Sequence, residues 1–214
     1  MSETTIVLPP ANISGSVTVE KALYNRRSRR NIISSKIGIE EVSQILWAAY
    51  GITEPKDEYN RTTVRLKTTP SAGTIYPLKI YLVAGLVDGL KAGIYSYRPV
   101  DHSIILLKEG DYRKELSKYS MNHTALEDAP FSLIYTTEFE HVKNRHHLKS
   151  KSKYAFIEVG HSSQNVHLQA ESLHLATFAI AAFEEKKIKQ LIELNKEQFP
   201  LYIMPVGKYN KSED

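Results

Sequence analysis

The chain of 214 residues contains no cysteine, which excludes disulfides, thiolate zinc sites, cysteine-held iron–sulfur clusters and cysteine nucleophiles. It has no apolar run of membrane-spanning length. Its N-terminus shows neither the basic start nor the apolar core of a signal peptide. We therefore expect a cytoplasmic protein, and any redox chemistry must come from a bound cofactor or from a metal without thiolate ligands.

Positive charge is only mildly in excess, with a net charge of +4 at pH 7. Hydrophobic residues make up 42% of the chain, which is enough for a folded core. The basic residues concentrate in two segments, 26–30 (RRSRR) and 141–153 (HVKNRHHLKSKSK). Basic stripes are typical of nucleic-acid binding, but the chain lacks helix-turn-helix spacing, zinc-finger spacing and an RNA-recognition consensus. A nucleic-acid ligand is therefore disfavoured and kept as an alternative.

The apolar spacing predicts an α+β fold, because helices and strands are mixed without βαβ alternation. Residues 1–17 are expected to form a loosely ordered arm before a single domain, 18–214, and 52–70 to form a long polar loop. Glycines and Pro99 punctuate three strands into an antiparallel meander. The expected helices are 18–27, 39–50, 153–175 and 184–194, with short helices within 111–127, and the expected strands are 79–84, 94–97, 103–107, 131–136, 177–181 and 201–206.

The helix expected at 153–175 is the longest, and its apolar residues follow helical spacing. One face comprises Phe156, Val159, Ser163, Val166, Ala170 and Leu173, of which all but Ser163 are apolar, and Ile157, Leu168 and Leu175 widen the apolar surface. This pattern indicates burial on several sides, as at a domain centre or a dimer interface.

The segment Arg26-Arg27-Ser28-Arg29-Arg30 places four guanidinium groups and a hydroxyl in five residues. Such groups repel one another, and the planar guanidinium fork suits a phosphate. The alternative is a solvated basic helix end, because cations favour helix C-termini. Spacing alone does not separate phosphate, nucleic acid and a local carboxylate network.

Two further segments suggest a ligand held by close backbone. In Pro70-Ser71-Ala72-Gly73-Thr74-Ile75-Tyr76-Pro77, a glycine permits close approach and two hydroxyls can hydrogen-bond. The composition of this segment fits an ordinary turn before the next strand at least as well as it fits a ligand-binding loop. Lys208 follows an apolar strand and can reach a phosphate, although such lysines are more often solvated.

The order of these motifs, RRSRR, PSAGTIYP, YAFIEVGHSSQNVHLQAESLHLAT and a closing PVGK, resembles the flavin-dependent nitroreductase superfamily. It is most similar to the branch that includes the SagB-type thiazole- and oxazole-forming dehydrogenases. The resemblance covers residues 18–208. It implies a nitroreductase-like fold with a mostly antiparallel sheet flanked by helices, an intertwined homodimer and two FMN molecules at the interface.

The resemblance also implies cofactor-binding residues and a reaction. Arginines and a serine of the first motif would contact FMN, the PSAGT segment would pack beside the ring from the partner subunit, and Lys208 would bind phosphate. Hydride would pass from NADH or NADPH through FMN to a small organic acceptor. The implied residues are Arg26, Arg27, Ser28, Arg30, Pro70, Ser71, Ala72, Gly73, Thr74, Ala181, Ala182 and Lys208.

The chain departs from the branch in two places. Ala181 stands where a glycine is usual, which adds a methyl group near the ring. His146 and His147 stand where azoline dehydrogenases carry a lysine–tyrosine pair ahead of the central helix. His146 is a candidate base because histidine titrates near neutral pH. Segments 111–127 and 138–152 are the expected lid.

Other readings stay open at this point. One is an azoline-type dehydrogenase acting on a modified peptide, and another is a non-catalytic flavin- or nucleic-acid-binding module. A third is a flavin-destroying or dehalogenating relative on the same scaffold. The long helix carries His161, His167 and His174 without ligand spacing for a metal. We therefore expect no metal there, and we expect these histidines and Glu158 to make polar contacts inside the dimer.

Overall fold

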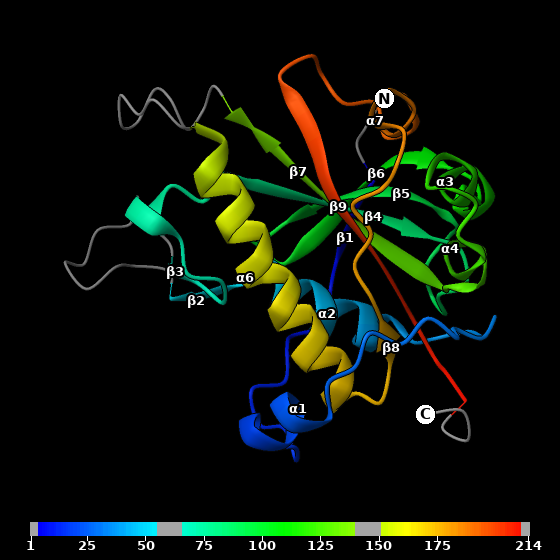
Figure 1. The fold of residues 1–214 in the computed structure, drawn as a ribbon. Helices are drawn as coiled ribbons and strands as arrows, with labels where there is room; N and C mark the ends of the chain where they lie inside the picture. Colours follow the sequence, from blue (N-terminus) through cyan, green and yellow to red (C-terminus); the bar gives the residue numbers. More distant parts are fainter. Residues whose placement is uncertain (1–3, 55–65, 140–150, 211–214) are drawn as a thin grey trace.

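The computed structural model describes residues 4–54, 66–139 and 151–210, which form a seven-stranded sheet with helices on both faces (Figure 1). The strand order is β1-β6-β5-β4-β7-β9-β8, and all neighbouring strands run antiparallel. The α+β class and the flanked antiparallel sheet are confirmed. The strands are β1 (Thr5–Val7), β4 (Leu78–Ala84), β5 (Gly93–Arg98), β6 (Ser103–Glu109), β7 (Phe131–Glu138), β8 (Ala176–Thr177) and β9 (Gln198–Gly207).

Two hydrophobic cores lie on opposite faces of this sheet. Successive strand residues point to opposite faces, so in β4 Ile80 and Leu82 join the core under α2 and α6, whereas Tyr81 and Val83 join the core under α3, α4 and α7. The helices are α1 (Val19–Asn25), α2 (Ile39–Tyr50), α3 (Arg113–Tyr119), α4 (Thr124–Asp128), α6 (Lys151–Ser172) and α7 (Glu185–Leu191). Both faces of the sheet are therefore covered.

The predicted meander is confirmed as β4, β5 and β6, with Leu82 opposite Tyr95 and Tyr95 opposite Leu106. The predicted helix 39–50 is also confirmed. Helix α1 is shorter than expected, because it begins after the capping Thr18 and ends at Asn25. The arginine segment consequently lies outside the helix.

Three expectations are wrong. Residues 5–7 of the arm form β1 on β6, and Ser43 Oγ donates to the Pro9 carbonyl at 2.5 Å, so this part of the arm is held by the sheet edge and α2. In the expected loop, β2 (Ile52–Glu54) pairs with β3 (Leu66–Lys67). The strand expected at 177–181 ends at Thr177, and only Ile180 then bridges back, to Ile203 of β9.

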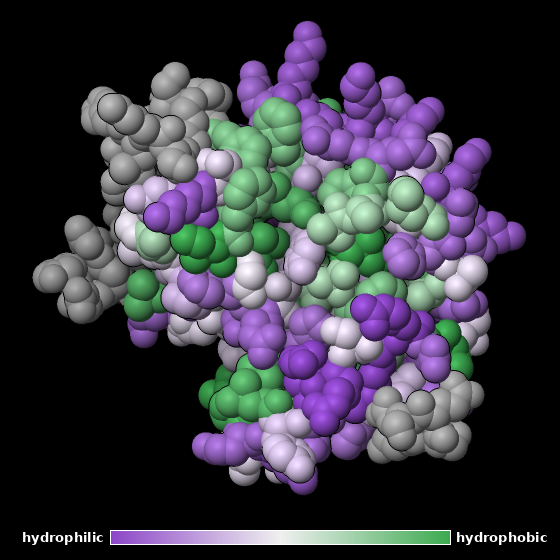
Figure 2. Space-filling model, in the orientation of Figure 1, coloured by the Kyte–Doolittle hydropathy of each residue, from purple (hydrophilic) through white to green (hydrophobic). Residues whose placement is uncertain are grey.

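Helix α6 crosses the sheet diagonally (Figure 1). Val159, Val166 and Ala170 of its predicted face are buried, but Phe156 is 55% exposed and Ile157 is 43% exposed. The N-terminal half of the helix therefore presents apolar side chains at the surface of the single chain, and Figure 2 shows hydrophobic residues gathered over this part of the molecule. In the described part of the chain, no helix has the length and apolar character needed to cross a bilayer.

Candidate functional site

The arginine segment runs beside the end of the sheet formed by β8 and β9. The Arg29 amide donates to the Thr177 carbonyl at 3.2 Å, and the Ile33 amide donates to the Lys208 carbonyl at 2.9 Å. These backbone bonds place the segment next to the C-terminal ends of both α6 and β9. Its side chains therefore meet residues that follow them in sequence by more than 140 positions.

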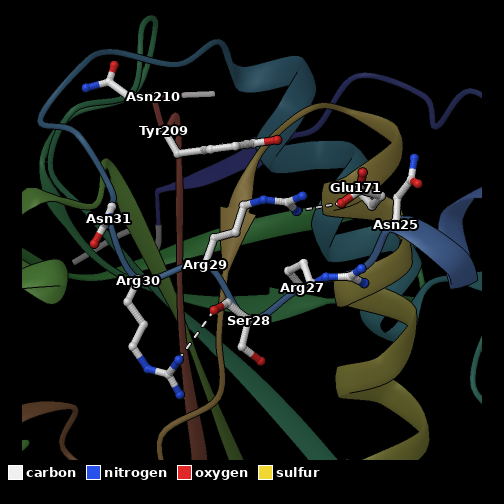
Figure 3. A pocket seen from close by; sticks show the side chains of 9 residues that line it. All are labelled: Asn25, Arg27, Ser28, Arg29, Arg30, Asn31, Glu171, Tyr209 and Asn210. Atoms are coloured by element: carbon white, nitrogen blue, oxygen red, sulfur yellow. Dashed lines mark hydrogen bonds and ion pairs between the residues drawn. The ribbon is translucent and has the colours of Figure 1, made fainter. Parts of the chain in front are cut away.

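A cavity of about 720 Å³ opens over this segment (Figure 3). Arg30 lies with its guanidinium carbon 5.3 Å from the Phe178 ring centroid. Arg27 folds back so that Nη1 donates to the Tyr24 and Arg26 carbonyls at 3.0 and 2.9 Å. The lining comprises Asn25, Arg27, Ser28, Arg29, Arg30, Asn31, Glu171, Tyr209 and Asn210. The guanidinium groups of Arg27 and Arg30, the Ser28 hydroxyl and asparagine amides supply donors suited to an oxyanion. The third guanidinium, that of Arg29, is paired with the carboxylate of Glu171.

Arg29 differs from its neighbours because it forms an ion pair with a residue of α6, whereas Arg27 and Arg30 donate to nearby backbone carbonyls, Arg30 to that of Ser28 at 3.4 Å. Its Nη1 donates to Glu171 Oε2 at 2.6 Å, and its guanidinium carbon lies 4.7 Å from the Tyr209 ring centroid. Figure 3 shows Arg29 leaving the segment on the side opposite to Arg30. Both partners of the ion pair are nearly buried, with side chains 11% and 10% exposed.

Of the remaining predicted residues on this side of the molecule, Lys208, Ala181 and Ala182 are exposed and Arg26 is half-buried. Lys208 lies directly after the end of β9, next to Tyr209 of the cavity wall. Ala181 and Ala182 follow the bridge between Ile180 and Ile203 and face solvent. Arg26 does not line the cavity. It lies near His167 of α6, where burial, together with the Arg26 charge, lowers the pKa of that imidazole to about 4.

The Pro70–Pro77 loop forms a strained turn at the other end of α6. Ala72–Thr74 make one 3₁₀ turn, and Gly73 has φ +67°. Thr74 and Tyr76 also adopt left-handed backbone, at φ +51° and +50°, which is costly for residues with a Cβ. Such strain persists only where surrounding contacts enforce it, and it gathers at functional sites.

Helix α6 supplies those contacts through one face. Glu158, His161 and Asn165 are spaced three and four residues apart, so their side chains project the same way. His161 Nδ1 lies 3.3 Å from the Pro70 carbonyl, and Asn165 Nδ2 donates to the Thr68 carbonyl at 3.1 Å. The polar part of the predicted helix motif therefore holds the loop of the same chain.

Glu158 fixes the two ends of the loop through two hydroxyl groups. Tyr50 donates to Glu158 Oε1 at 2.5 Å and accepts the Leu78 amide at 3.2 Å. Ser71 donates to Glu158 Oε2 and accepts the Tyr76 amide at 2.8 Å. One buried carboxylate thus anchors both the first and the last turn of the segment.

Lys67 adds a half-buried positive charge to this cluster. Its Nζ lies 3.5 Å from the Tyr50 ring centroid and 5.1 Å from that of Tyr76. Burial lowers the pKa of Lys67 to about 8, although the Glu158 carboxylate opposes the shift. Burial also raises the pKa of Glu158, against the hydrogen bonds from Ser71 and Tyr50 and the Lys67 charge. Sequence reasoning missed Lys67 and Tyr50. Tyr50 ends α2 just before β2, and the pairing of β2 with β3 brings Lys67 of β3 next to it.

The two groups of predicted cofactor residues are not brought together within one chain. The loop is anchored at Glu158 and the arginine segment at Glu171, thirteen residues later in α6. At 1.5 Å per residue, these anchors are about 20 Å apart along the helix. His146 lies outside the described residues. In the ranges that the structure describes, no three histidine or acidic side chains gather in a way that could hold a metal ion.

Comparison with known proteins matches residues 23–208 to the family described as "Nitroreductase family". The chain belongs to the nitroreductase family. A relative from Methanocaldococcus jannaschii, MJ1384, provisionally described as a nitroreductase, is 35% identical over 192 residues, which cover 90% of this chain and 91% of the relative.

Solved nitroreductase-fold structures confirm the architecture. A protein of Ralstonia eutropha JMP134, provisionally described as a nitroreductase, has a TM-score of 0.80 at 22% identity and matches 97% of this chain and 90% of its own. The E. coli microcin synthetase McbBCD, bound to truncated pro-MccB17, contains a chain with TM-score 0.71 at 20% identity, matching 96% of this chain and 79% of that one. The NADPH:FMN oxidoreductase of Vibrio harveyi, complexed with NAD⁺, has a TM-score of 0.63 at 16% identity and matches 90% of this chain and 69% of its own.

Proposed function

We propose that this nitroreductase-family protein is an FMN-dependent oxidoreductase that transfers hydride from NADH or NADPH to a small organic acceptor. The observation that carries the proposal is the arginine-lined cavity of about 720 Å³ at the end of the sheet in a chain of this family. In the same proposal, residues 18–214 form the FMN-binding domain, two copies form a homodimer, and exposed Phe156 and Ile157 belong to the interface.

The residues present fit the phosphate of FMN. Arg27, Ser28 and Arg30 line the cavity with charged and hydroxyl donors, and Thr177 Oγ1, next to the segment, is buried without a hydrogen-bond partner. We assign the phosphate to Arg27, Ser28 and Arg30, with Lys208 at the rim and Arg26 supporting it. Guanidinium groups are the side chains best suited to bind a phosphate through paired hydrogen bonds.

The ring would lie between one chain's residues and the partner's loop. Because the loop anchor and the arginine anchor are about 20 Å apart on α6, we assign Pro70, Ser71, Ala72, Gly73 and Thr74 to the site of the other protomer. Their small side chains leave room for an acceptor beside the ring, and Ala181 and Ala182 border it from the first protomer. When bound, FMN supplies the hydride-transfer chemistry. The protein's part is to bind, orient and exclude water.

A direct test is a titration of the purified protein with FMN, followed by flavin fluorescence. The expected result is saturable binding that Arg30→Ala weakens and Lys36→Ala leaves unchanged, because Lys36 pairs with Asp88 on the exposed surface. No saturable binding by the wild-type protein would refute the proposal.

An azoline-type dehydrogenase acting on a modified peptide is the second candidate. The similarity to McbBCD, a microcin synthetase bound to a peptide precursor, favours it. His146 and His147 replace the lysine–tyrosine pair of that branch, and we propose His146 as the base in this case. Oxidation of an azoline-containing peptide by the FMN-loaded protein, lost in His146→Ala, is the result that this candidate predicts.

A further inference from the structure

Glu171 is an unusual residue to find in the wall of a cavity that binds an anion. Its carboxylate is 10% exposed and lies in the last turn of α6, where the helix dipole disfavours negative charge. It also lines the same cavity as Arg27, Ser28 and Arg30. A bare carboxylate here would repel a phosphate, so its presence calls for a compensating role.

The compensation comes from Arg29. The ion pair at 2.6 Å neutralises Glu171, and the Tyr209 ring packs against the other side of the guanidinium at 4.7 Å. Replacing a buried ion pair by apolar residues is often neutral or stabilising, so the pair is not explained by stability alone. Figure 3 shows Arg29 directed towards Glu171 and Arg30 leaving the segment on the opposite side, where Arg30 Nη1 donates to the Ser28 carbonyl at 3.4 Å.

We propose that Arg29 is not a phosphate ligand: it pairs with Glu171 and so neutralises a carboxylate that would otherwise repel the anion bound by Arg27, Ser28 and Arg30. This inference rests on the proposed function, since the anion in question is the phosphate of FMN. In this assignment Arg27 and Arg30 bind the ligand, and Arg29 neutralises the acidic side chain in the cavity wall.

The test compares FMN with riboflavin, which lacks the phosphate. Arg29→Met leaves the Glu171 carboxylate without its cation, so FMN should bind at least about tenfold more weakly, while riboflavin affinity changes by less than about threefold. Arg29→Met/Glu171→Leu removes both charges, and FMN affinity should return to within about threefold of wild type. A general folding defect would weaken both ligands and would not be rescued.

Arg30 provides the matched control. Arg30→Ala should lose FMN affinity in the same way, and adding Glu171→Leu should not restore it, because a ligand is missing and not a partner. Thermal unfolding of each variant shows whether it is folded, and the double variant keeps the test informative if Arg29→Met alone does not fold.

The outcomes separate this inference from the function on which it rests. If the double variant stays as weak as Arg29→Met, then Arg29 is itself a phosphate ligand and the inference is overturned. Unchanged FMN affinity in Arg29→Met overturns it as well, with the proposed function intact. A wild-type protein that binds neither FMN nor riboflavin overturns the proposed function and this inference with it.

Discussion

Tyr50→Phe removes a single oxygen from the centre of the loop anchor and keeps the volume of the side chain. The Tyr50 hydroxyl donates a hydrogen bond to Glu158 Oε1 at 2.5 Å and accepts one from the Leu78 amide at 3.2 Å. A hydrogen bond to a charged acceptor contributes about 1.5–3 kcal/mol, and an unsatisfied buried amide adds about 1–3 kcal/mol. We expect a loss of about 3 kcal/mol in the free energy of unfolding, a large part of the 5–15 kcal/mol typical of a domain.

The assay is urea unfolding followed by far-ultraviolet circular dichroism, with the slope compared between variants to confirm a two-state transition. Tyr202→Phe is the control, because Tyr202 is a partly exposed tyrosine of β9 outside the loop anchor. It should change stability by no more than about 0.5 kcal/mol. If Tyr50→Phe falls within the same limit, the buried network does not hold the loop and the reasoning fails.

Three further predictions concern charge. Arg30→Ala should weaken FMN binding by about tenfold to a hundredfold, the effect of losing one charge-assisted hydrogen bond, and an affinity equal to wild type in a fluorescence titration would remove Arg30 from the site. His167 has a pKa of about 4 in the folded chain, against 6.5 for an ordinary histidine. As the pH drops, the unfolded chain therefore binds the proton before the folded chain does. The free energy of unfolding should fall between about pH 6.5 and 4 for this reason. Urea unfolding at pH 7 and pH 5 should show a smaller loss in His167→Gln, and equal losses would contradict the assignment. The pKa of Lys67 falls from 10.5 to about 8 on folding. The stability of the wild type relative to Lys67→Met should therefore rise between about pH 8 and 9.5. A stability difference that stays constant over this range would show that folding does not desolvate Lys67.

Much of the fold could be predicted from local patterns in the sequence. Helix α2 was predictable because its apolar residues repeat at helical spacing and Gly51 follows directly. The strands of the meander were predictable because apolar runs are separated by glycine and Pro99. In each case the signal lies within the element or at its ends.

Elements decided by distant contacts could not be read in this way. Strand β1 has only three residues, and its pairing with β6 depends on a partner about 100 positions later. Residues 177–181 favour a strand by composition, yet the chain leaves the sheet after Thr177 and returns only at Ile180. Tertiary pairing outweighs β-propensity at such edges.

The candidate site shows the same division. The arginine segment and the PSAGTIYP loop stand out by composition, but their anchors do not. Glu171 lies in a helix like many other acidic residues, and Lys67 follows a polar stretch, so neither has a local signal. The structure pairs Glu171 with Arg29 of the arginine segment and places Lys67 over the Tyr76 ring of the loop, where its charge acts on Glu158.

The most direct test of the central claim is the visible absorbance spectrum of the FMN-loaded protein under nitrogen, before and after NADH or NADPH is added. The account predicts the bands of oxidised, protein-bound flavin and their loss on addition of the nucleotide, followed by their return when an acceptor is supplied. Bands that persist with both nucleotides, in a protein that has bound FMN, would contradict the proposed oxidoreductase and leave a flavin-binding module.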